Sequence, residues 1–554
     1  MTARTTVTGT ARYEEVLEYL RAVHEPGFGR PSDLRELHVS ADGLRTVVTA
    51  SVPGGFDGVA PTALFTADDG ALRRISAAGC SARGARFSPD GHTLAFLADR
   101  AEPGVFGLHL LADDRLGEAE GTPPVPGTVE YLHWSPDGRR ILLGVAGLGA
   151  ELSGGQGSGV NLAGSADAPA WAPRVEGGTP GEAWRSLWSF TPATGALDRL
   201  TPEGLNCWEA GWCGSDRVVA VTSGGPGEDD WYGAELSVVG ADDGSVRTLL
   251  RSAVQLGWPA GSPDGRWIAV AEAVCSDRWV VAGDLLLVDT GSGAVRRVDT
   301  RGVDVTRLQW IDDARLGYLG LRRLESVAGV LPVPDGPDGP VTEVVASATA
   351  RGGSTFHPDG AFTADGRVCT IEESYGLPQQ VVLSGPDGDR VLASVAHPGT
   401  GHLRSVGGTA RPVTWDAPDG TEIDGILCTP GGDGPFPLVV NIHGGPIWAF
   451  RETWSMRAQW VPLLVSRGYA VLNPNPRGSS GRGQDFAGLV VGDMGGADTH
   501  DYLSGIDALV ARGVADGSRV GLIGGSYGGY MSSWLVTRDR RFAAAVPVSP
   551  VTDW

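Results

Sequence analysis

The sequence has 554 residues, of which 41% are hydrophobic and 20% are charged, a composition typical of a globular protein. A single hydrophobic core does not extend over such a length, so we expect at least two domains. The formal net charge of −22 argues against nucleic acid or an anionic membrane as a partner.

The N-terminal sequence and the cysteines indicate the compartment. The first ten residues lack the apolar core of a secretory signal, and no stretch approaches the roughly 20 apolar residues that span a membrane. We therefore predict a cytoplasmic protein. The six cysteines are scattered, with no CxxC pair and no nearby histidine ligands, so we expect neither zinc nor a disulfide framework, and no cofactor.

An amphipathic helix is predicted near the N-terminus, over residues 11–23. Its apolar residues lie at spacings i, i+3, i+4 and i+7, which place them on one helical face: Tyr13, Val16, Leu17 and Leu20. Pro26 and Gly27 follow and should end the helix.

A turn motif followed by a strand-like run then occurs in seven copies, as in Phe87-Ser-Pro-Asp-Gly91 before His92-Thr-Leu-Ala-Phe-Leu. The aspartates that mark the copies lie 48, 47, 79, 48, 49 and 52 residues apart; they are Asp42, Asp90, Asp137, Asp216, Asp264, Asp313 and Asp365. This period is typical of a four-stranded propeller blade. We predict a seven-bladed β-propeller over residues 31–408, with the Asp-Gly pairs closing hairpins.

The interval of 79 residues contains an insertion, residues 144–181, that is rich in Gly, Ala, Ser and Pro. It includes the stretch 153–159 and is predicted to be an extended loop. Two interpretations stay open: a tolerated surface insertion, which we favour, or a lid over the mouth of the propeller.

Strands alternate with helices after Arg411. Strand-like stretches are predicted at 413–416, 422–428, 436–442 and 469–472, and helical stretches at 454–466 and 498–512. This alternation predicts a parallel α/β sheet in a C-terminal domain of residues 409–554.

The strongest motif is Gly524-x-Ser526-x-Gly528, which lies between an apolar strand-like run and a predicted helix over 530–536. That context is typical of a nucleophile elbow, which holds a serine at a strained turn with its hydroxyl in a cleft. With glycine at 84 positions, the bare pattern would occur about once by chance. The alternatives are an idle serine in a glycine-rich turn and a dinucleotide loop, whose GxGxxG spacing is not met.

An oxyanion hole is predicted beside this serine. In an α/β-hydrolase one donor is the backbone N–H of the residue after the nucleophile, here Tyr527, and the other comes from the loop after the third strand. We assign Gly445, in His443-Gly-Gly-Pro446, as the second donor. His443 itself is expected to be a structural hydrogen-bonding residue rather than a base.

Together, the propeller repeat, His443-Gly-Gly-Pro446, the loop 475–483, Gly492-Asp-Met-Gly-Gly496 and the elbow resemble the prolyl oligopeptidase family (S9) of serine peptidases. The acylaminoacyl-peptidase and dipeptidyl-aminopeptidase branch is the most similar. The resemblance implies a propeller followed by an α/β-hydrolase domain, with an N-terminal segment, residues 1–30, packed on the hydrolase domain. It also implies cleavage of short peptides through an acyl-enzyme on Ser526, with the propeller excluding folded proteins.

The sequence departs from the family after Ser526. The triad order in this fold is Ser, Asp, His, yet no histidine follows Ser526, and Asp539 and Asp553 come too early for the triad acid. We expect about 80 further residues in a complete hydrolase domain, and we expect the chain as written to be inactive, since His500 is a poor candidate for a substitute base. Without a further strand, the strand at 542–548 should form an open sheet edge.

Three hypotheses follow: a propeller-gated serine peptidase, an esterase or lipase on the same elbow, and a non-catalytic propeller that binds peptides. Ester turnover without peptide cleavage would favour the second, and peptide binding unaffected by Ser526→Ala would favour the third. The sequence is compatible with a homo-oligomer but does not fix the oligomeric state.

Overall fold

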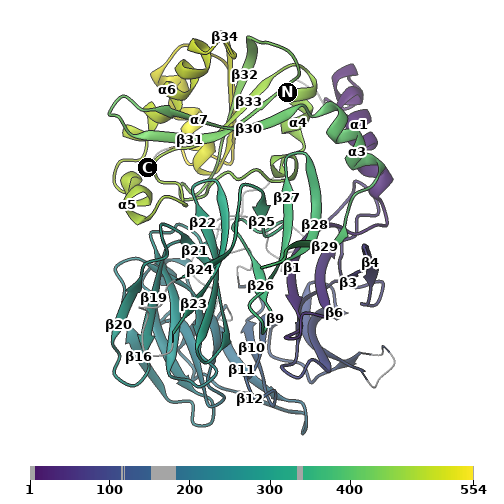
Figure 1. The fold of residues 1–554 in the computed structure, drawn as a ribbon, viewed down its shortest axis with the longest axis vertical. Coiled ribbons are helices and arrows are strands. Elements are labelled where there is room, and N and C mark those ends of the chain that lie inside the picture. Colours follow the sequence, from purple (N-terminus) through teal and green to yellow (C-terminus); the bar gives the residue numbers. More distant parts are fainter. Residues whose placement is uncertain (1–6, 114–116, 118, 151–182, 334–340, 553–554) are drawn as a thin grey trace, which may run out of the picture.

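The computed structural model describes residues 7–113, 117, 119–150, 183–333 and 341–552. The predicted stretch 153–159 and Asp553 lie outside these residues. Two parts are visible in Figure 1: a ring of antiparallel sheets below and a layered sheet with helices above.

The described residues of the lower part form seven sheets, which confirms the predicted propeller. The first three blades are β1–β4 (Ser32–Val39, Thr46–Ser51, Thr62–Asp68, Ala71–Arg74), β5–β8 (Ala82–Phe87, Thr93–Glu102, Val105–Ala112, Glu120–Gly121) and β9–β12 (Thr128–Trp134, Ile141–Ala146, Arg185–Thr191, Ala196–Arg199). The next three are β13–β16 (Asn206–Cys213, Arg217–Ser223, Glu235–Gly240, Val246–Leu250), β17–β20 (Gln255–Gly261, Trp267–Ala273, Asp284–Asp289, Val295–Val298) and β21–β24 (Asp304–Asp312, Arg315–Arg322, Glu325–Pro332, Thr342–Ser347). The last blade comprises β25–β29 (Ala350–Arg351, Gly360–Phe362, Val368–Ser374, Leu377–Gly385, Gly388–Ser394), and a short helix, α2 (Glu228–Tyr232), precedes β15.

The repeated turn motif connects the first two long strands of each blade. In the second blade Asp90 accepts hydrogen bonds from the Ser88 hydroxyl at 2.6 Å and from the backbone N–H of His92 at 3.0 Å, while Gly91 has φ of +77°. These bonds lower the pKa of Asp90. The aspartate therefore fixes the turn through its side chain, and the glycine alone takes the positive φ.

One copy of the motif was assigned to the wrong aspartate. In the β21–β22 turn the carboxylate that accepts the backbone N–H, from Ala314 at 2.9 Å, belongs to Asp312, whereas Asp313 is exposed. The adjacent acidic residues made the two positions indistinguishable by spacing.

Side-chain packing closes the ring between the first and last blades. Leu34 and Phe65 of the first blade share one core cluster with Ile371 and Val381 of the last. The Gly70 N–H donates to the Leu392 carbonyl at 2.9 Å, which adds a backbone bond to this junction. Each blade is thus a continuous segment of chain, and closure depends on burial of apolar surface.

The upper part is a six-stranded sheet in the order β30-β31-β33-β32-β34-β35. Its strands are Thr409–Asp416, Glu422–Thr429, Ala470–Asn475, Phe436–Ile442, Ala515–Gly525 and Phe542–Val548 in that order. The pairs among β32, β33, β34 and β35 are parallel, as predicted, while β30 and β31 join as antiparallel strands. Among the described residues, β35 pairs with β34 alone.

Helices cover this sheet on both sides: α4 (Trp460–Ser466), α6 (Ala497–Ala511) and α7 (Tyr527–Arg538), with the short α5 (Gln484–Ala487) and η4 (Gly488–Val490). The predicted helix over 454–466 is interrupted, because Ser455, Met456 and Arg457 have φ of +48°, +55° and +56°. Arg457 instead reaches the propeller, where it donates to the Gly353 carbonyl. Contact with the other domain overrides the local helical pattern here.

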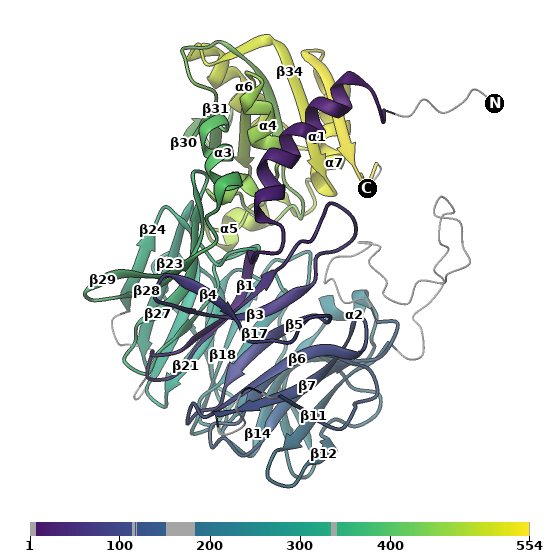
Figure 2. The same ribbon diagram turned by 90° about the vertical axis from the view of Figure 1, so that its right-hand side faces the viewer.

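The N-terminal helix α1 (Ala11–His24), followed by the single turn η1 (Glu25–Gly27), runs along the side of the upper part (Figure 2). It packs Tyr19 and Val23 against Leu403 of α3 (Pro398–Val406) and Leu463 of α4. The last blade strand ends at Ser394, so α3 lies outside the blades, although the sequence interpretation extended the propeller to residue 408. No described helix combines the length and apolar character needed to cross a membrane.

Buried hydrogen bonds join the two parts. The carboxylate of Asp304, on the innermost strand of the sixth blade, accepts from the backbone N–H groups of Gly481 at 2.6 Å and Gly483 at 3.2 Å. Asp304 is 2% exposed, and burial raises the pKa of its carboxyl to about 6. The loop that carries both glycines also packs beside the elbow, as described below.

Candidate active site

Ser526 lies at the turn between β34 and α7, as predicted for a nucleophile elbow. Its backbone has φ of +56° and ψ of −118°, a region that few residues other than glycine adopt. Strand and helix therefore meet at one strained residue. The two strands that pair with β34 hold the end of this strand in place, since Gly524 lies opposite Ile442 of β32 and Pro547 of β35.

The glycines of the motif allow a close crossing of backbones. A Cβ at Gly524 would lie 2.4 Å from the Gly528 carbonyl oxygen, and one at Gly528 would lie 2.1 Å from that of Ile442. Real Cβ atoms do not approach oxygen so closely, so both positions require glycine. Gly525, by contrast, has no neighbour within 4 Å of a Cβ.

The side chain of Ser526 is exposed, and within the described residues its hydroxyl has no hydrogen-bond partner. Its backbone N–H donates to the Val548 carbonyl at 3.0 Å, which ties the elbow to β35. His500 is exposed on α6 and makes no hydrogen bond to Ser526 within the described residues. The hydroxyl is thus free to meet a substrate but has no general base beside it in the described part of the chain.

The His443–Pro446 loop lies directly beside the elbow. A Cβ at Gly444 would be 3.5 Å from the Ser526 Cβ and 3.4 Å from the Gly525 carbonyl oxygen. Gly445 has φ of +112°, a conformation that favours glycine. As the first residue of α7, Tyr527 has a backbone N–H without an acceptor in the helix. The structure therefore brings the two predicted donor segments together at Ser526, while the donor roles of Tyr527 and Gly445 stay predictions.

His443 is buried and holds the loop in shape. Its Nδ1 lies 2.9 Å from the Gly444 carbonyl oxygen and its Nε2 lies 3.1 Å from the Ser479 hydroxyl. Burial lowers the pKa of His443 to about 4, so the ring is neutral at pH 7. These contacts agree with the structural role predicted for this histidine.

The loop 475–483 clamps the same segment from the other side. Ser480 donates from both its N–H, at 3.0 Å, and its hydroxyl, at 2.6 Å, to the Ile447 carbonyl. Asn475 accepts from the Phe450 N–H at 2.7 Å and returns a hydrogen bond to the Phe450 carbonyl at 3.1 Å. The backbone that faces Ser526 is therefore supported at both ends.

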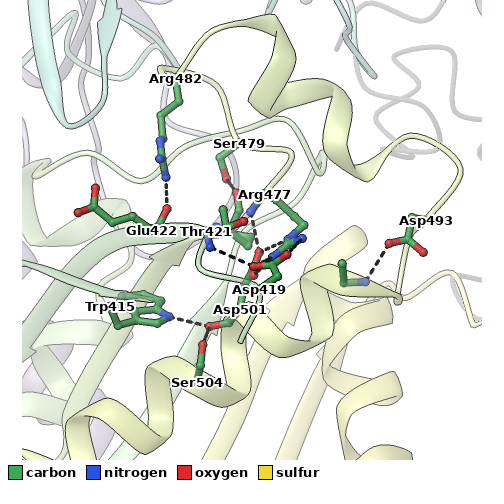
Figure 3. A network of polar contacts seen from close by, with 12 residues as sticks. Trp415, Asp419, Thr421, Glu422, Arg477, Ser479, Arg482, Asp493, Asp501 and Ser504 are labelled. Atoms are coloured by element: carbon green, nitrogen blue, oxygen red, sulfur yellow. Dashed lines mark hydrogen bonds and ion pairs between the residues drawn. The ribbon is translucent and has the colours of Figure 1, made fainter. Parts of the chain in front are cut away.

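Arg477 fixes this loop on the helix α6, and Figure 3 shows its guanidinium between two carboxylates. It donates to Asp501 at distances from 2.8 to 3.1 Å and to Asp419 at 2.9 and 3.2 Å. Asp501 is fully buried, so its charge requires this partner. The Asp501 carbonyl also accepts from the Trp415 indole at 2.8 Å, which links the network to β30.

A second polar contact holds the residue after the nucleophile. The Tyr527 hydroxyl donates to the carboxylate of Asp498, at the start of α6, and both side chains are at most 2% exposed. Burial raises the pKa of Asp498 to about 6. This contact fixes the first turn of α7 and hence the direction of the Tyr527 N–H.

Comparison with known proteins finds a family match in the C-terminal part of the chain. Residues 454–554, which contain the elbow and α6, match the model of the prolyl oligopeptidase family. The C-terminal segment of the chain is therefore similar to this family. Over 146 residues the chain is 39% identical to "Uncharacterized peptidase YuxL" of Bacillus subtilis (strain 168), a segment that covers 26% of this chain and 22% of that protein. It is 34% identical over 136 residues to the human acylamino-acid-releasing enzyme, which covers 24% of this chain and 18% of the relative.

The fold likeness extends over almost the whole chain. An acylaminoacyl peptidase of Pyrococcus horikoshii superimposes with a TM-score of 0.70 and 18% identity, covering 96% of this chain and 79% of that one. This likeness supports the combination of a propeller with an α/β-hydrolase fold in this chain. The chain spans less than a quarter of the length of the sequence relatives that it matches.

Several residues that support the site were not predicted from the sequence. Ser479, Ser480 and Arg477 lie in a glycine-rich loop that the sequence analysis quoted without assigning individual roles. Asp498 offered one usable signal, because a carboxylate in the first turn of a helix with apolar neighbours is expected to have a partner. Its partner, however, is 29 residues away, and spacing does not predict such a contact.

Proposed function

We propose that the protein is a serine peptidase that hydrolyses short peptides through an acyl-enzyme on Ser526. The observation that carries the proposal is the strained, exposed Ser526 beside the backbone of Gly444, with the free N–H end of α7 directed at the same point. The match of residues 454–554 to a peptidase family supports peptides as the substrate class.

The proposed chemistry follows from these positions. The Ser526 oxygen attacks the substrate carbonyl carbon, its proton passes to a base, and the carbonyl oxygen becomes an oxyanion. The N–H groups of Tyr527 and Gly445 would stabilise that charge, together with the dipole of α7. Protonation of the leaving amine breaks the C–N bond and leaves the acyl group on Ser526, and water then releases it.

The missing participant is the base. No histidine follows Ser526 in the sequence, and His443 is occupied by Ser479. We infer that these 554 residues by themselves give little hydrolysis, because an unactivated serine hydroxyl is a weak nucleophile. The cytoplasmic location and the oligomeric state stay predictions.

Added imidazole tests the proposal, since it can replace an absent histidine side chain. The 554-residue chain is incubated with a peptide p-nitroanilide and with p-nitrophenyl acetate, with and without imidazole. We expect release of p-nitroaniline that rises with imidazole concentration and is lost in Ser526→Ala, after subtraction of the imidazole background. Equal rates in the two proteins would overturn the role of Ser526, and turnover of the ester without the anilide would favour an esterase.

A further inference from the structure

A second cavity lies inside the propeller, away from Ser526. It has a volume of about 470 Å³ and is lined by the first strand of six blades and by β26 of the seventh. Its lining runs from Leu37 to Ala364 and includes the turn prolines Pro89, Pro136 and Pro263, but no described residue of the hydrolase part. The cavity therefore opens at the end of the propeller that carries the Ser-x-Asp-Gly turns. We call it the axial cavity.

A loop between β18 and β19 separates the axial cavity from the hydrolase domain. Trp279, in this loop, lines the cavity and lies with its ring centroid 5.9 Å from that of Tyr131 and 6.3 Å from that of Trp258. On the other side of the loop, Cys275 and Val280 share a core cluster with Ile447, of the segment beside Ser526.

The loop between β18 and β19 also makes polar contacts with its own blade and with the last blade. The Trp258 indole donates to the Val281 carbonyl at 2.8 Å, and His357 Nε2, in the last blade, lies 3.0 Å from the Val280 carbonyl oxygen. These contacts hold the loop between the cavity and the catalytic side. In the described part of the chain this loop therefore lies between the axial cavity and the segment beside Ser526.

Two arginines line the pocket. Arg307 lies 3.4 Å from Asp359 and packs its guanidinium over the Trp258 ring. The guanidinium of Arg86 donates to the Ala85 carbonyl at 2.8 Å, and within the described residues no carboxylate lies within 4.0 Å of it. Burial and the nearby charge of Arg307 lower the pKa of Arg86 to about 10, so it is still charged at pH 7. Arg86 is therefore a cation that lacks a close anion.

Each of three acidic groups around the pocket has at least one partner. Glu36 accepts from the Gly84 N–H at 2.9 Å and the Thr49 hydroxyl at 3.2 Å, and Asp359 faces Arg307. Glu209 accepts from the Trp258 N–H at 2.7 Å through Oε2, while its Oε1 is buried and has no partner among the described residues. Burial raises the pKa of Glu209 to about 7. The histidines His38 and His133 are neutral at pH 7, because burial lowers the pKa of each.

Several aromatic side chains line the rest of the wall. Trp134, Trp212 and Trp310 each donate their indole N–H to a backbone carbonyl of a neighbouring blade, at 3.1, 3.0 and 3.0 Å. These donors are therefore not available to a ligand, and the indoles offer apolar ring surface. An apolar pocket of several hundred Å³ with a few convergent polar groups is typical of a small-molecule site.

We propose that the axial cavity binds a small organic carboxylate with an apolar body, held by Arg86 together with Arg307. The planar guanidinium fork matches the geometry of a carboxylate, and the indole faces accommodate the apolar body. This site is distinct from Ser526 and does not depend on the proposed peptidase activity.

A matched pair of ligands tests the proposal by calorimetry on the 554-residue chain. The carboxylate is 3-phenylpropionate, its neutral counterpart is 3-phenylpropanol, and inorganic phosphate is the third probe. We expect 3-phenylpropionate to bind at least about tenfold more tightly than either of the others, since a charge-assisted bidentate contact contributes more than about 1.4 kcal/mol. Equal affinity for the alcohol would overturn the role of the arginines, and equal affinity for phosphate would overturn the role of the indoles.

Substitution of Arg86 tests whether this residue holds the carboxylate of the ligand. Arg86→Gln should weaken binding of 3-phenylpropionate at least about tenfold, whereas Arg390→Gln, at an exposed position on β29, should leave it unchanged. Unchanged affinity in a folded Arg86→Gln protein would contradict the proposal. The unaltered chain, crystallised with 3-(4-bromophenyl)propionate, gives a test that needs no variant: an anomalous bromine peak in the axial cavity supports the site, and a peak only elsewhere overturns it.

Discussion

The propeller and the catalytic sheet position their strands in different ways. In the first six blades the strands that pair are consecutive in the chain, as β5, β6 and β7 are, and in four blades a Ser-x-Asp-Gly turn forms the first connection. In the catalytic sheet β34 pairs with β32, so that Gly524 lies opposite Ile442, 82 residues earlier. Local turn chemistry thus determines the propeller, whereas contacts between distant segments determine the active site.

The closest of these distant contacts should be the most sensitive to substitution. Gly528→Ala would place a Cβ 2.1 Å from the Ile442 carbonyl oxygen, so α7 or β32 must move. We expect the free energy of unfolding, measured by urea denaturation, to fall by about 3 kcal/mol or more. The matched control is Gly525→Ala, where the new Cβ has no neighbour within 4 Å and the change should be within about 0.5 kcal/mol. Similar losses in the two variants would show that the crossing of strand and helix does not require glycine.

The junction between the two parts should depend on pH. The folded-state pKa of Asp304 is about 6, above its usual value near 3.9 in an unfolded chain. The folded state therefore binds this proton more tightly, and the resulting stabilisation is complete below about pH 4 and is lost as the pH rises through 6. The loss corresponds to roughly 2–3 kcal/mol.

Asp304→Asn removes this titration. Relative to the wild-type chain, the variant should gain stability between pH 4 and pH 7, measured by urea denaturation across that range, while Asp433→Asn, at an exposed loop position, should follow the wild type. A constant difference between Asp304→Asn and the wild type at every pH would contradict the assignment of the shift to Asp304.

The smallest predicted change in stability distinguishes two neighbouring aspartates in the β21–β22 turn. Asp312→Ala removes the acceptor for the Ala314 N–H and should cost about 1 kcal/mol, measured as a shift of the urea midpoint. Asp313→Ala changes an exposed side chain and should cost little. The reverse order would restore the assignment that the repeat spacing gave.

These contrasts explain what the sequence could and could not predict. The seven blades followed from the repeat, and the elbow at Ser526 followed from glycines whose steric role is local to one turn. The helix predicted over 454–466 was wrong at its N-terminal end, because Arg457 binds a propeller carbonyl that no local pattern reveals. The clamp formed by Ser479, Ser480 and Arg477, the contact between Tyr527 and Asp498, and the axial cavity all join segments distant in the sequence, so they required the structure.

The central claim is that Ser526 is the nucleophile, and mass spectrometry of the acylated chain tests it most directly. The 554-residue chain is treated with p-nitrophenyl acetate and imidazole, quenched in acid and digested. We predict an acetyl group on Ser526 that depends on imidazole and is absent from the corresponding peptide of Ser526→Ala. Acetylation at other residues with Ser526 unmodified would contradict the account.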